Sequence, residues 1–532
     1  MFTFKFGWSF RNFLWLLFYI LILAVLLKHS FSYLDPDFGW HLQVGQEISK
    51  TWSVPSLNQY NYTFTGNWVD HEWLSNFIIY EIYSHWGYIS LSLIFALVVV
   101  LGFLLLRRQV RFLGLPGSNV MIAIFQFFGL LACSPHFGVR VQELGWLFLI
   151  ILLLIIEKYE QRRRYLYLVF LIPVFYAWSC LHGSFTLGIF LLFAYLAVKI
   201  FEKIWRSSRF NKLAIFNNSL TWREIIYFTV FLSLALVATM LTPYGLNLYD
   251  FLGGYTNTFY LKHIQEWLPQ YYYPFLYYQL VYLAVATLAF GLYLYNSWLS
   301  VKKYPINLWR VFLFIFFLGL AFKSRRHFPL FFVATFPLII ESYLNDLAIK
   351  QHDSEEIYSK IIKFFLAGGL ICTAAAMFLK INFINQPFTY FSKKYPRDAV
   401  VFLRQNKTYS EANIFNSYGW GGYLIAVWPE KKLFIDGRLP QVKFAGQTFL
   451  EEYAEFMKKD ADFAGKLKQY AIQTVLIQTK DPEVNVKNWE KLFFGINEND
   501  LTDPNYFRKY LEESPEWQVV YQDETSIIYF KK

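Results

Sequence analysis

Hydrophobic runs recur along the first 380 residues of the chain, and short polar connections separate them. Most runs approach the roughly 20 residues that a helix needs to cross a bilayer, and a few are shorter. The runs lie at residues 13–27, 88–106, 120–133, 144–156, 165–180, 185–200, 225–241, 275–295, 311–322, 328–340 and 361–379. The pattern predicts an α-helical multi-pass membrane domain with about eleven transmembrane helices, within one or two.

A different pattern begins at residue 381, where the long hydrophobic runs stop. Segments with strand character lie at residues 412–415, 432–435, 474–478, 517–521 and 526–530, the last two joined by a turn around Asp523. Residues 449–469 have the charge density and spacing of an amphipathic helix. The sequence therefore predicts a membrane domain over residues 1–380 and a small α/β domain over residues 381–532.

The first connection on the predicted outer side, residues 28–86, is long enough to hold its own helices. Residues 40–52 have an amphipathic helical pattern that Pro55 stops, and residues 58–70 are rich in turn-forming Asn, Thr and Gly. Residues 71–83 resume a helical pattern with many aromatic side chains, which suit the membrane interface. We expect this connection to lie on the membrane surface.

Composition and charge placement support a membrane protein. Of the 532 residues, 56% are hydrophobic and only 16% are charged, whereas about a quarter of the residues of a soluble protein are charged. The formal net charge is +11, and the basic residues gather in alternate connections. These residues are Lys5, Arg11, Arg107, Arg108, Arg111, Lys158, Arg162, Arg163, Arg164, Lys199, Lys203, Arg206, Arg209, Lys212, Arg223, Lys302, Lys303, Arg310, Lys350, Lys360 and Lys363. Such asymmetry marks cytoplasmic loops of a plasma-membrane protein, so it predicts topology rather than binding to nucleic acid.

This topology places the N-terminus in the cytoplasm and, after an odd number of spans, the C-terminal domain outside it. No small-residue cleavage site follows the first run, so we interpret that run as a retained anchor rather than a signal peptide. The three cysteines, Cys133, Cys180 and Cys372, lie in or beside hydrophobic runs without metal-type spacing. We expect them to be small core residues.

Nearly every predicted outer connection contributes an ionisable residue, whereas the cytoplasmic connections offer mostly Lys and Arg. The polar residues at the outer ends of the spans are Asp35, Asp37, His41, Asp70, His71, Glu72, His136, Arg140, Glu143, His182, Gln265, Glu266, Arg325, Arg326 and His327. Ionisable groups at membrane depth are costly, so they usually belong to a functional site. The contrast between the two faces predicts a site on the outer face.

Each of these residues also has a purely structural interpretation. Asp35-Pro36-Asp37 suits the cap of a surface helix, and His41 alone suits a hydrogen-bonded structural histidine. His71-Glu72-Trp73 suits an interfacial anchor, and His182 suits a helix break whose imidazole bonds a freed carbonyl. Arg325-Arg326-His327 can snorkel at a membrane edge, but these residues oppose the positive-inside trend, which favours a bound anion. Together, the residues favour one site.

Transfer of a sugar from a lipid phosphate is the chemistry that suits these residues. A polyprenyl phosphate or diphosphate presents its anion at the level of the headgroups, where Arg holds it through a planar fork. A carboxylate that faces the anomeric carbon can take the proton from an incoming hydroxyl. The Asp35-Pro36-Asp37 pair could instead bind a divalent cation, such as Mg²⁺ or Mn²⁺, that bridges diphosphate oxygens.

The chain resembles the GT-C superfamily of integral-membrane glycosyltransferases, in a bacterial branch. Members use polyprenyl-linked sugar donors and carry an essential acidic residue in the first outer loop. The membrane segments that carry the resemblance are Asp35-Pro36-Asp37-Phe38-Gly39-Trp40-His41-Leu42, Trp68-Val69-Asp70-His71-Glu72-Trp73-Leu74, Trp178, His182-Gly183-Ser184-Phe185, Thr242-Pro243-Tyr244-Gly245, Glu266-Trp267 and Arg325-Arg326-His327. Phe415-Asn416-Ser417-Tyr418-Gly419-Trp420-Gly421-Gly422-Tyr423 and Phe434-Ile435-Asp436-Gly437-Arg438 extend it into the tail, so it covers most of the chain.

The resemblance implies a role for each group of residues. Asp35 or Asp37 takes the place of the outer-loop acid, as catalytic base or metal ligand. Arg325-Arg326-His327 binds the donor phosphate, and we expect Arg140 to join it. The residues expected to shape the acceptor or metal pocket are His41, His71, Glu72, His182, Glu266 and Trp267.

The tail segment with Trp420, Gly421 and Gly422, followed by Asp436 and Arg438, is similar to the tryptophan- and glycine-rich acceptor motif of oligosaccharyltransferases. No acid directly follows the tryptophan, so the resemblance does not extend to recognition of a peptide acceptor. The structural alternative is a glycine-bearing strand and turn, in which the backbone turns tightly or approaches a ligand.

The sequence thus predicts an inverting glycosyltransferase on the outer face of a bacterial plasma membrane. It would move a monosaccharide from a polyprenyl phosphate carrier to a glycan, lipid or protein acceptor. One alternative is a transporter or flippase for lipid-linked sugar, which would need ionisable residues near the bilayer midplane. The other is a non-catalytic scaffold with an extracytoplasmic binding tail, in which the acids and arginines would be dispersed.

Overall fold

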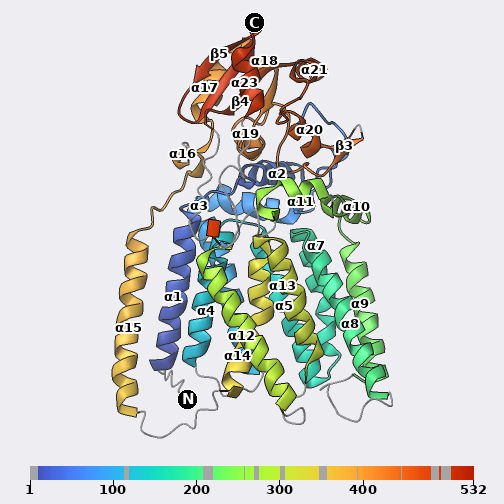
Figure 1. Ribbon diagram of the computed structural model, residues 1–532, viewed down its shortest axis with the longest axis vertical. Helices are drawn as coiled ribbons and strands as arrows, with labels where there is room; N and C mark the ends of the chain where they lie inside the picture. The colour runs from blue at the N-terminus through green and yellow to red at the C-terminus, as the bar shows by residue number, and fades with distance from the viewer. Residues whose placement is uncertain are drawn as a thin grey trace.

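The computed structural model is mostly helical and describes most of the chain. The described residues are 10–112, 119–207, 220–256, 258–268, 275–299, 306–346, 356–391, 394–444, 446–480, 491–492 and 505–532. Figure 1 shows a bundle of long helices, a layer of short helices above it and the C-terminal elements at the top.

The long helices of the bundle run side by side (Figure 1). Their bounds are α1 Phe10–Ser30, α3 Trp73–Phe112, α4 Asn119–Cys133, α5 Gln142–Arg162, α7 Leu171–Leu181 (preceded by the short α6 Leu166–Val169), α8 Phe185–Ser207, α9 Trp222–Thr239, α12 Tyr277–Leu299, α13 Leu308–Lys323, α14 Phe328–Asp346 and α15 Glu356–Leu379. Each predicted hydrophobic run falls almost entirely within one of these helices or the α6–α7 pair. Of the described helices, α1, α3, α8, α9 and α12 are long and apolar enough to cross a membrane. The predicted multi-pass helical membrane domain is confirmed, and the number of spans stays a prediction.

Local capping explains where several of these helices begin. Thr221 opens α9 with a capping box, in which its hydroxyl accepts the backbone N–H of Glu224 and the Glu224 side chain accepts the N–H of Thr221. The side chain of Asn307 opens α13 by accepting the backbone N–H of Arg310 at 3.2 Å. The interior of the bundle is filled by large aromatic side chains that are fully buried, among them Trp178, Tyr195 and Phe103.

Helix α3 has a kink at Gly87, which joins a predicted surface helix to a predicted span. Gly87 has φ of 73°, a conformation that favours glycine. A Cβ atom at this position would clash with the side chain of Asn385, which lies in the segment after α15. The kink therefore fixes how the chain leaves the layer of short helices and enters the bundle.

The layer above the bundle consists of short helices from distant parts of the chain. It includes α2 Phe38–Thr51, α10 Asn247–Gly253 and α11 Thr258–His263, together with the single 3-10 turns η2 Gly254–Thr256, η3 Gln265–Trp267 and η4 Arg325–His327. The helix predicted at residues 40–52 is confirmed as α2. This layer brings the predicted outer connections together beneath the C-terminal elements (Figure 1).

The C-terminal elements form a small α/β unit around a four-stranded sheet with strand order β1-β4-β6-β5. The strands are β1 Asn413–Asn416, β4 Ile472–Gln478, β5 Trp517–Gln522 and β6 Ser526–Lys531. β1 is parallel to β4, whereas β6 is antiparallel to both β4 and β5. The turn around Asp523 is confirmed, since the carboxylate accepts the backbone N–H groups of Thr525 and Ser526 at 2.8 and 2.6 Å. Four of the five predicted strands are thus confirmed.

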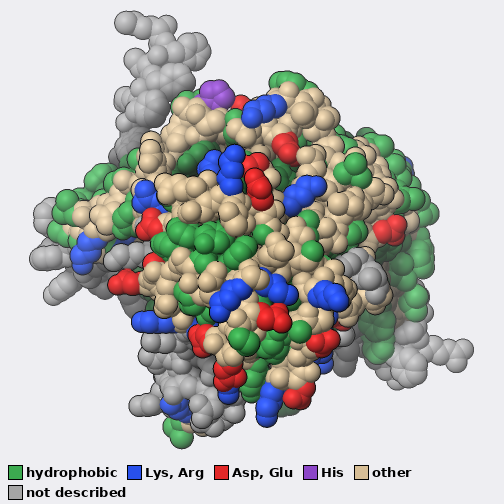
Figure 2. All heavy atoms as spheres, turned by 90° about the horizontal axis from the view of Figure 1, so that it is seen from above, with side chains coloured by type: hydrophobic (Ala, Val, Ile, Leu, Met, Phe, Trp, Pro, Cys, Tyr) green, Lys and Arg blue, Asp and Glu red, His purple; other side chains and the backbone are tan. Residues whose placement is uncertain are grey.

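The remaining secondary-structure elements among the described residues of this unit are short. They are α16 Pro387–Tyr390, α17 Arg397–Gln405, α18 Lys407–Glu411, η7 Tyr418–Trp420, α19 Gly421–Val427, α20 Phe449–Glu455, α21 Phe463–Gln469, α23 Tyr506–Glu513 and the hairpin of β2 Lys443–Phe444 with β3 Gln447–Thr448. Figure 2, seen from this end, shows basic and acidic side chains intermingled over the surface.

Three sequence predictions are wrong. Residues 432–435 do not form a strand of the sheet, because Leu433 pairs with the first outer connection: its N–H donates to Tyr60 O at 2.8 Å and its carbonyl accepts from Tyr62 N at 3.2 Å. The single helix predicted at residues 449–469 is two helices, because the Asp462 carboxylate caps a new helix by accepting the N–H of Gly465. Cys372 is exposed on α15, while Cys133 and Cys180 are buried as expected.

The predicted orientation rests partly on residues without a described structure. Arg209, Lys212, Lys302, Lys303 and Lys350 lie outside the described residues, as does Lys5. The assignment of the N-terminus to the cytoplasm therefore stays a prediction.

Candidate functional site

Asp35 and Asp37 lie in the turn between α1 and α2. Asp35 Oδ1 accepts the backbone N–H of Asp37 at 2.8 Å, and Asp37 Oδ1 accepts the indole N–H of Trp40 at 3.0 Å. Asp37 directly precedes α2, but its side chain makes no capping hydrogen bond. Its carboxylate is therefore not used as a helix cap, which removes the structural interpretation offered for this residue.

A continuous ion network joins this turn to residues that lie far along the chain. Arg140 pairs with Asp35 through its Nε atom, and its Nη2 atom lies 2.6 Å from Glu266 Oε1. The other oxygen of Glu266 lies 3.1 Å from Arg326 Nη1. Acid and guanidinium groups from four separate segments are thus linked in one chain of contacts.

The Arg326 end of the network is held by its own turn. The Ser324 hydroxyl donates to the backbone carbonyl of Glu266 at 2.5 Å and accepts the backbone N–H of Arg326 at 3.2 Å. The Arg326 guanidinium lies 4.7 Å from the centre of the Trp267 ring, an arrangement that favours the cation. His327 contacts the same ring edge-on, with ring centres 5.5 Å apart. Arg325 and His327 share the turn η4 with Arg326.

A second polar cluster lies around Glu72. Glu72 Oε1 lies 3.4 Å from His182 Nε2 and 3.6 Å from His71 Nε2. The backbone N–H of Ser184 points at His182 Nδ1 at 3.1 Å. A backbone N–H can only donate, so His182 Nδ1 accepts and its proton lies on Nε2, facing Glu72.

His41 belongs to a relay of side chains beside this cluster. His41 Nδ1 lies 2.5 Å from Asn76 Oδ1, and Asn76 Nδ2 donates to Asp70 Oδ2 at 2.7 Å. The second oxygen of Asp70 accepts the backbone N–H of Glu72 at 3.2 Å. This order places the His41 proton on Nδ1 and leaves Nε2 as an acceptor.

Burial and neighbouring charges separate the acids of the site. Burial raises the pKa of Asp37, and the neighbouring Asp35 raises it further, to about 7. Burial raises the pKa of Asp70 to about 7 and that of Glu72 well above its usual value. Burial also raises the pKa of Glu266, but the charges of its two arginine partners outweigh it and hold the pKa at about 2. Glu266 is therefore ionised, whereas Asp37 can exchange a proton near neutral pH.

The histidines of the site are neutral. Burial lowers the pKa of His41 to about 4 and that of His71 to about 3. It also lowers the pKa of His182, and the charges of His71 and Arg326 lower it further. Neutral imidazoles can accept or donate one hydrogen bond each, which suits contacts with sugar hydroxyls.

Three tyrosines from different segments lie within electrostatic range of Asp37. Tyr260 of α11 is buried, whereas Tyr255 of η2 and Tyr418 of the C-terminal unit are half-buried. Burial raises the pKa of each hydroxyl, and the charge of Asp37 raises it further. A tyrosine offers both a hydroxyl and an apolar ring face to a ligand.

The C-terminal unit forms one wall of the site. α19 packs on α2 through glycines, since a Cβ atom at Gly422 would clash with the carbonyl of Pro36, and one at Gly39 would clash with the carbonyl of Gly422. A Cβ atom at Gly437 would clash with the carboxylate of Asp37. The glycine motif of the tail is thus explained by close packing against the acid turn.

Arg438 fixes this wall to the first outer connection. Its guanidinium pairs with Asp436 at 2.8 Å, donates to Asn58 Oδ1 at 3.0 Å and lies 4.6 Å from the ring centres of both Tyr60 and Trp68. The side chains of the ion pair are fully buried. Asp436 and Arg438 therefore hold the wall in place rather than face the space around Asp37.

The acid pair was also considered as a cation site. Both oxygens of Asp35 are engaged, one by the Asp37 N–H and one by Arg140. Within the part of the chain that the structure describes, no group of three His, Cys, Asp or Glu side chains is placed to hold a metal ion. A Mg²⁺ or Mn²⁺ ion held by both acids would compete with Arg140 for Asp35, and such a cation stays a prediction.

Contacts join many of the predicted residues in two clusters, and their roles stay predictions. The first cluster holds Asp35, Arg140, Glu266, Trp267, Arg326 and His327, and the second holds His41, Asp70, His71, Glu72 and His182. Glu143 is in neither cluster, since its carboxylate accepts the backbone N–H of Gly138.

The structure adds four residues that sequence reasoning missed, Asn76, Tyr255, Tyr260 and Ser324. It also gives contacts to Ser184 and Gly437, which the sequence motifs contain without a role of their own. Asn76 carries a usable signal, because it follows Glu72 by four positions at the start of a helix and so lies on the same face. The others depend on packing between segments that the sequence does not reveal.

The fold is similar to that of a solved membrane oligosaccharyltransferase. The archaeal oligosaccharyltransferase AglB from Archaeoglobus fulgidus, solved with an inhibitory peptide and a dolichol-phosphate, is similar with TM-score 0.50 and 12% identity, over 89% of this chain and 70% of that chain. A crystal structure of the A. fulgidus oligosaccharyltransferase tethered with an acceptor peptide containing the NVT sequon has TM-score 0.49 and 13% identity, over 86% and 68%. The complex of that oligosaccharyltransferase with Zn and sulfate has TM-score 0.46 and 12% identity, over 86% of this chain and 68% of that chain.

No protein-family model matches the chain, and a comparison with curated proteins gives no match. At 12% identity the structural similarity establishes the fold alone. The predicted GT-C resemblance and fold class are confirmed at that level, and the chain is a multi-pass membrane protein.

Proposed function

We propose that this protein is a membrane glycosyltransferase that moves a sugar from a polyprenyl-phosphate-linked donor to a glycan, lipid or protein acceptor on the outer face of the plasma membrane. The observation that carries the proposal is that Asp35 joins Asp37 to the Arg140–Glu266–Arg326 network, since its carboxylate contacts both the Asp37 N–H and Arg140. Asp37 can take a proton near neutral pH, and the arginines of the network can hold an anion.

The donor phosphate would lie against the guanidinium groups of Arg325 and Arg326, with Arg140 and His327 beside them. Arginine binds phosphate oxygens through a planar fork, and η4 presents two arginines in succession. Ser324 and Trp267 hold Arg326 in position before the donor arrives. This preorganisation lowers the cost of binding, because the guanidinium is already ordered.

Asp37 would act as the base. As the acceptor attacks the anomeric carbon, its proton passes to the Asp37 carboxylate, the new glycosidic bond forms and the bond to the phosphate oxygen breaks. The electron pair of that bond stays with the leaving phosphate, whose charge the arginines stabilise. Attack from the side opposite the phosphate inverts the anomeric centre, so the proposed reaction is inverting.

The remaining polar groups suit the sugar and the acceptor. Buried Glu72 and half-buried His71 and His182 offer hydrogen-bonding groups next to Tyr255, whose ring lies 5.7 Å from the His71 ring. The neighbour with the same fold was solved with a dolichol-phosphate and a peptide, which supports a lipid-linked donor. A divalent cation stays a prediction, and no step proposed above depends on one.

Mass spectrometry of lipid-linked sugars tests this function in cells. Cells that lack the protein should accumulate the sugar-charged polyprenyl phosphate, because its transfer is blocked. Wild-type protein should clear it, and Asp37→Asn, expressed to the same level in the membrane, should not. Clearance by Asp37→Asn at the wild-type rate would contradict the proposed role of this acid.

A further inference from the structure

A separate cluster of charges lies at the end of the bundle opposite to Asp37, with some members fully buried and others half-buried. α13 has 16 residues and is therefore about 24 Å long. The turn with Arg326 follows one end of this helix, whereas Arg310 lies in the first turn at the other end. The two charge clusters are thus separated by most of the length of the bundle.

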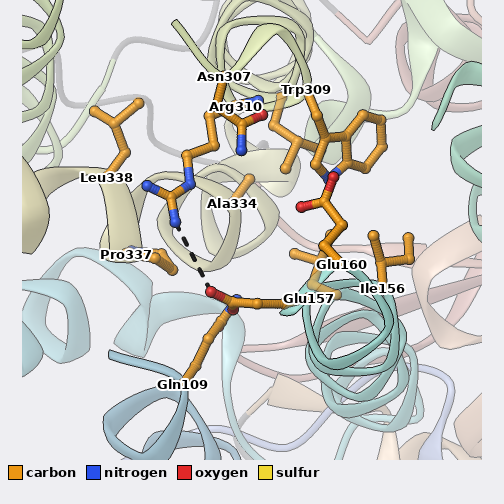
Figure 3. Close-up of a pocket in the computed structure, with 12 residues that line it drawn as sticks. Gln109, Ile156, Glu157, Glu160, Asn307, Trp309, Arg310, Ala334, Pro337 and Leu338 are labelled. Atoms are coloured by element: carbon orange, nitrogen blue, oxygen red, sulfur yellow. Dashed lines mark hydrogen bonds and ion pairs between the residues drawn. The ribbon is translucent and has the colours of Figure 1, made fainter. Parts of the chain in front are cut away.

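Arg310 is held between two acids from neighbouring helices. Its guanidinium pairs with Glu341 of α14 and lies 3.8 Å from Glu157 of α5. Figure 3 shows the Arg310 side chain extended toward Glu157, with Gln109 of α3 next to that carboxylate. Four helices therefore meet at this point.

A second ion pair completes the cluster. Lys199 of α8 is fully buried and lies 2.6 Å from Glu160 Oε1 and 3.0 Å from Glu202 Oε2. Together with the Arg310 group, four carboxylates lie in ion pairs with these two basic side chains. The charges of Lys158 and Arg206 also act on Glu157 and Glu202.

The cluster borders a small cavity with a volume of about 40 Å³ (Figure 3). Gln109, Glu157, Glu160, Asn307 and Arg310 supply its polar lining, and the rest is apolar. One buried water needs roughly 10–15 Å³ of such space. The cavity is therefore large enough for a small ion with a few waters and too small for a sugar or a lipid headgroup.

Two oxygen atoms of this lining have no hydrogen-bond partner among the described residues. They are Gln109 Oε1 and Glu157 Oε2. Gln109 is only 5% exposed, so its oxygen loses contact with bulk water without gaining a donor from the protein. Both atoms are acceptors, which means that a ligand here must supply positive charge or hydrogen-bond donors.

We propose that this cavity binds a small hydrated inorganic cation through Gln109 Oε1 and Glu157 Oε2. Oxygen atoms of carboxylates and amides are the ligands that alkali and alkaline-earth ions prefer. The ion would bridge α3 and α5 next to the helices that carry Arg310 and Glu341. This site is independent of the proposed transfer site and of any cation at Asp35 and Asp37.

Thermal unfolding of the full-length protein in detergent tests the proposal. Purified protein is transferred to N-methylglucamine chloride at constant pH, and Na⁺, K⁺, Mg²⁺ or Ca²⁺ replaces N-methylglucamine at constant ionic strength. At least one of these ions should raise the Tm, measured by tryptophan fluorescence, by about 2–4 °C in a saturable way. Glu157→Gln and Gln109→Leu should each raise the midpoint, the ion concentration that gives half of the Tm increase, by about 10–100-fold.

Glu430→Gln serves as the matched control, because Glu430 is an exposed acid that pairs with Arg404 in the C-terminal unit. It should keep the wild-type midpoint. If Glu157→Gln does not fold, Gln109→Leu alone decides the matter. The proposal is overturned if all four ions behave like N-methylglucamine, which would mean that the cavity holds water only, or if the folded variants keep the wild-type midpoint.

Discussion

Asp35 and Asp37 are two residues apart, yet their carboxylates have different surroundings. Asp35 is bound by Arg140, whereas Asp37 accepts one hydrogen bond from Trp40 and lies against Gly437. In the proposed mechanism this difference makes Asp37 the base. Asp35 then positions Arg140, and Arg140 contacts Glu266, which also pairs with Arg326.

The pKa of Asp37 leads to a pH dependence of transfer. Burial and Asp35 raise this pKa to about 7, so below pH 7 the carboxyl already carries a proton and cannot accept another. The rate of transfer under conditions where chemistry limits it should therefore fall about tenfold per pH unit below pH 7 and level off above it. Initial rates in reconstituted vesicles between pH 5 and 8 check this. A rate that stays constant down to pH 5 would show that Asp37 is not the base.

At the scale of elements, the contact between the acid turn and the C-terminal unit explains the glycine motif of the tail. Gly422 and Gly437 bring α19 and the loop after it against Pro36 and Asp37. Neither contact leaves room for a side chain. The tail is therefore part of the site wall rather than a separate binding module.

Substitution of Gly437 tests this contact. Gly437→Ala should lower the transfer rate by at least about tenfold, because the added methyl group displaces the Asp37 carboxylate from its productive position. Gly319→Ala is the matched control, since a Cβ atom at Gly319 meets no atom within 4 Å. Transfer assays on vesicles with equal amounts of each variant measure the effect. Equal rates for the two variants would mean that Gly437 does not touch the working acid.

The element predictions show what a sequence reveals locally. The hydrophobic runs coincide with helices because a span must satisfy its backbone hydrogen bonds within itself, whatever its neighbours are. Residues 432–435 have the residues of a strand, but their partner is Tyr60–Tyr62, more than 300 positions earlier. Pairing at such a distance depends on the whole fold, and strand propensity alone does not reveal it.

At the scale of the whole molecule, the candidate site could be predicted as a set of residues but not as a geometry. The ionisable residues at the outer ends of spans are visible in the sequence because charge stands out against hydrophobic runs. The link from Asp35 to Arg326 passes through Arg140 and Glu266. That order of contacts, like the insertion of Arg438 between Tyr60 and Trp68, is set by packing between distant segments.

The predicted orientation of the molecule has its own test. In a Cys372→Ser background, a cysteine in place of exposed Glu430 should react with a membrane-impermeant maleimide added to intact cells. A cysteine in place of exposed Arg162, at the other end of the bundle, should react only after the membrane is permeabilised. The positive-inside distribution is the reason for this expectation. The reverse labelling pattern would place the proposed site in the cytoplasm.

Transfer by purified protein in proteoliposomes tests the central claim most directly, that Asp37 and Arg326 act in one site. The donor is the polyprenyl-linked sugar that accumulates in cells lacking the protein, and the acceptor fraction comes from the same cells. Asp37→Asn should lower the transfer rate by about 10²–10⁴-fold, and Arg326→Gln should lower it and weaken donor binding, with both variants folded. Wild-type rates in both variants would contradict the account.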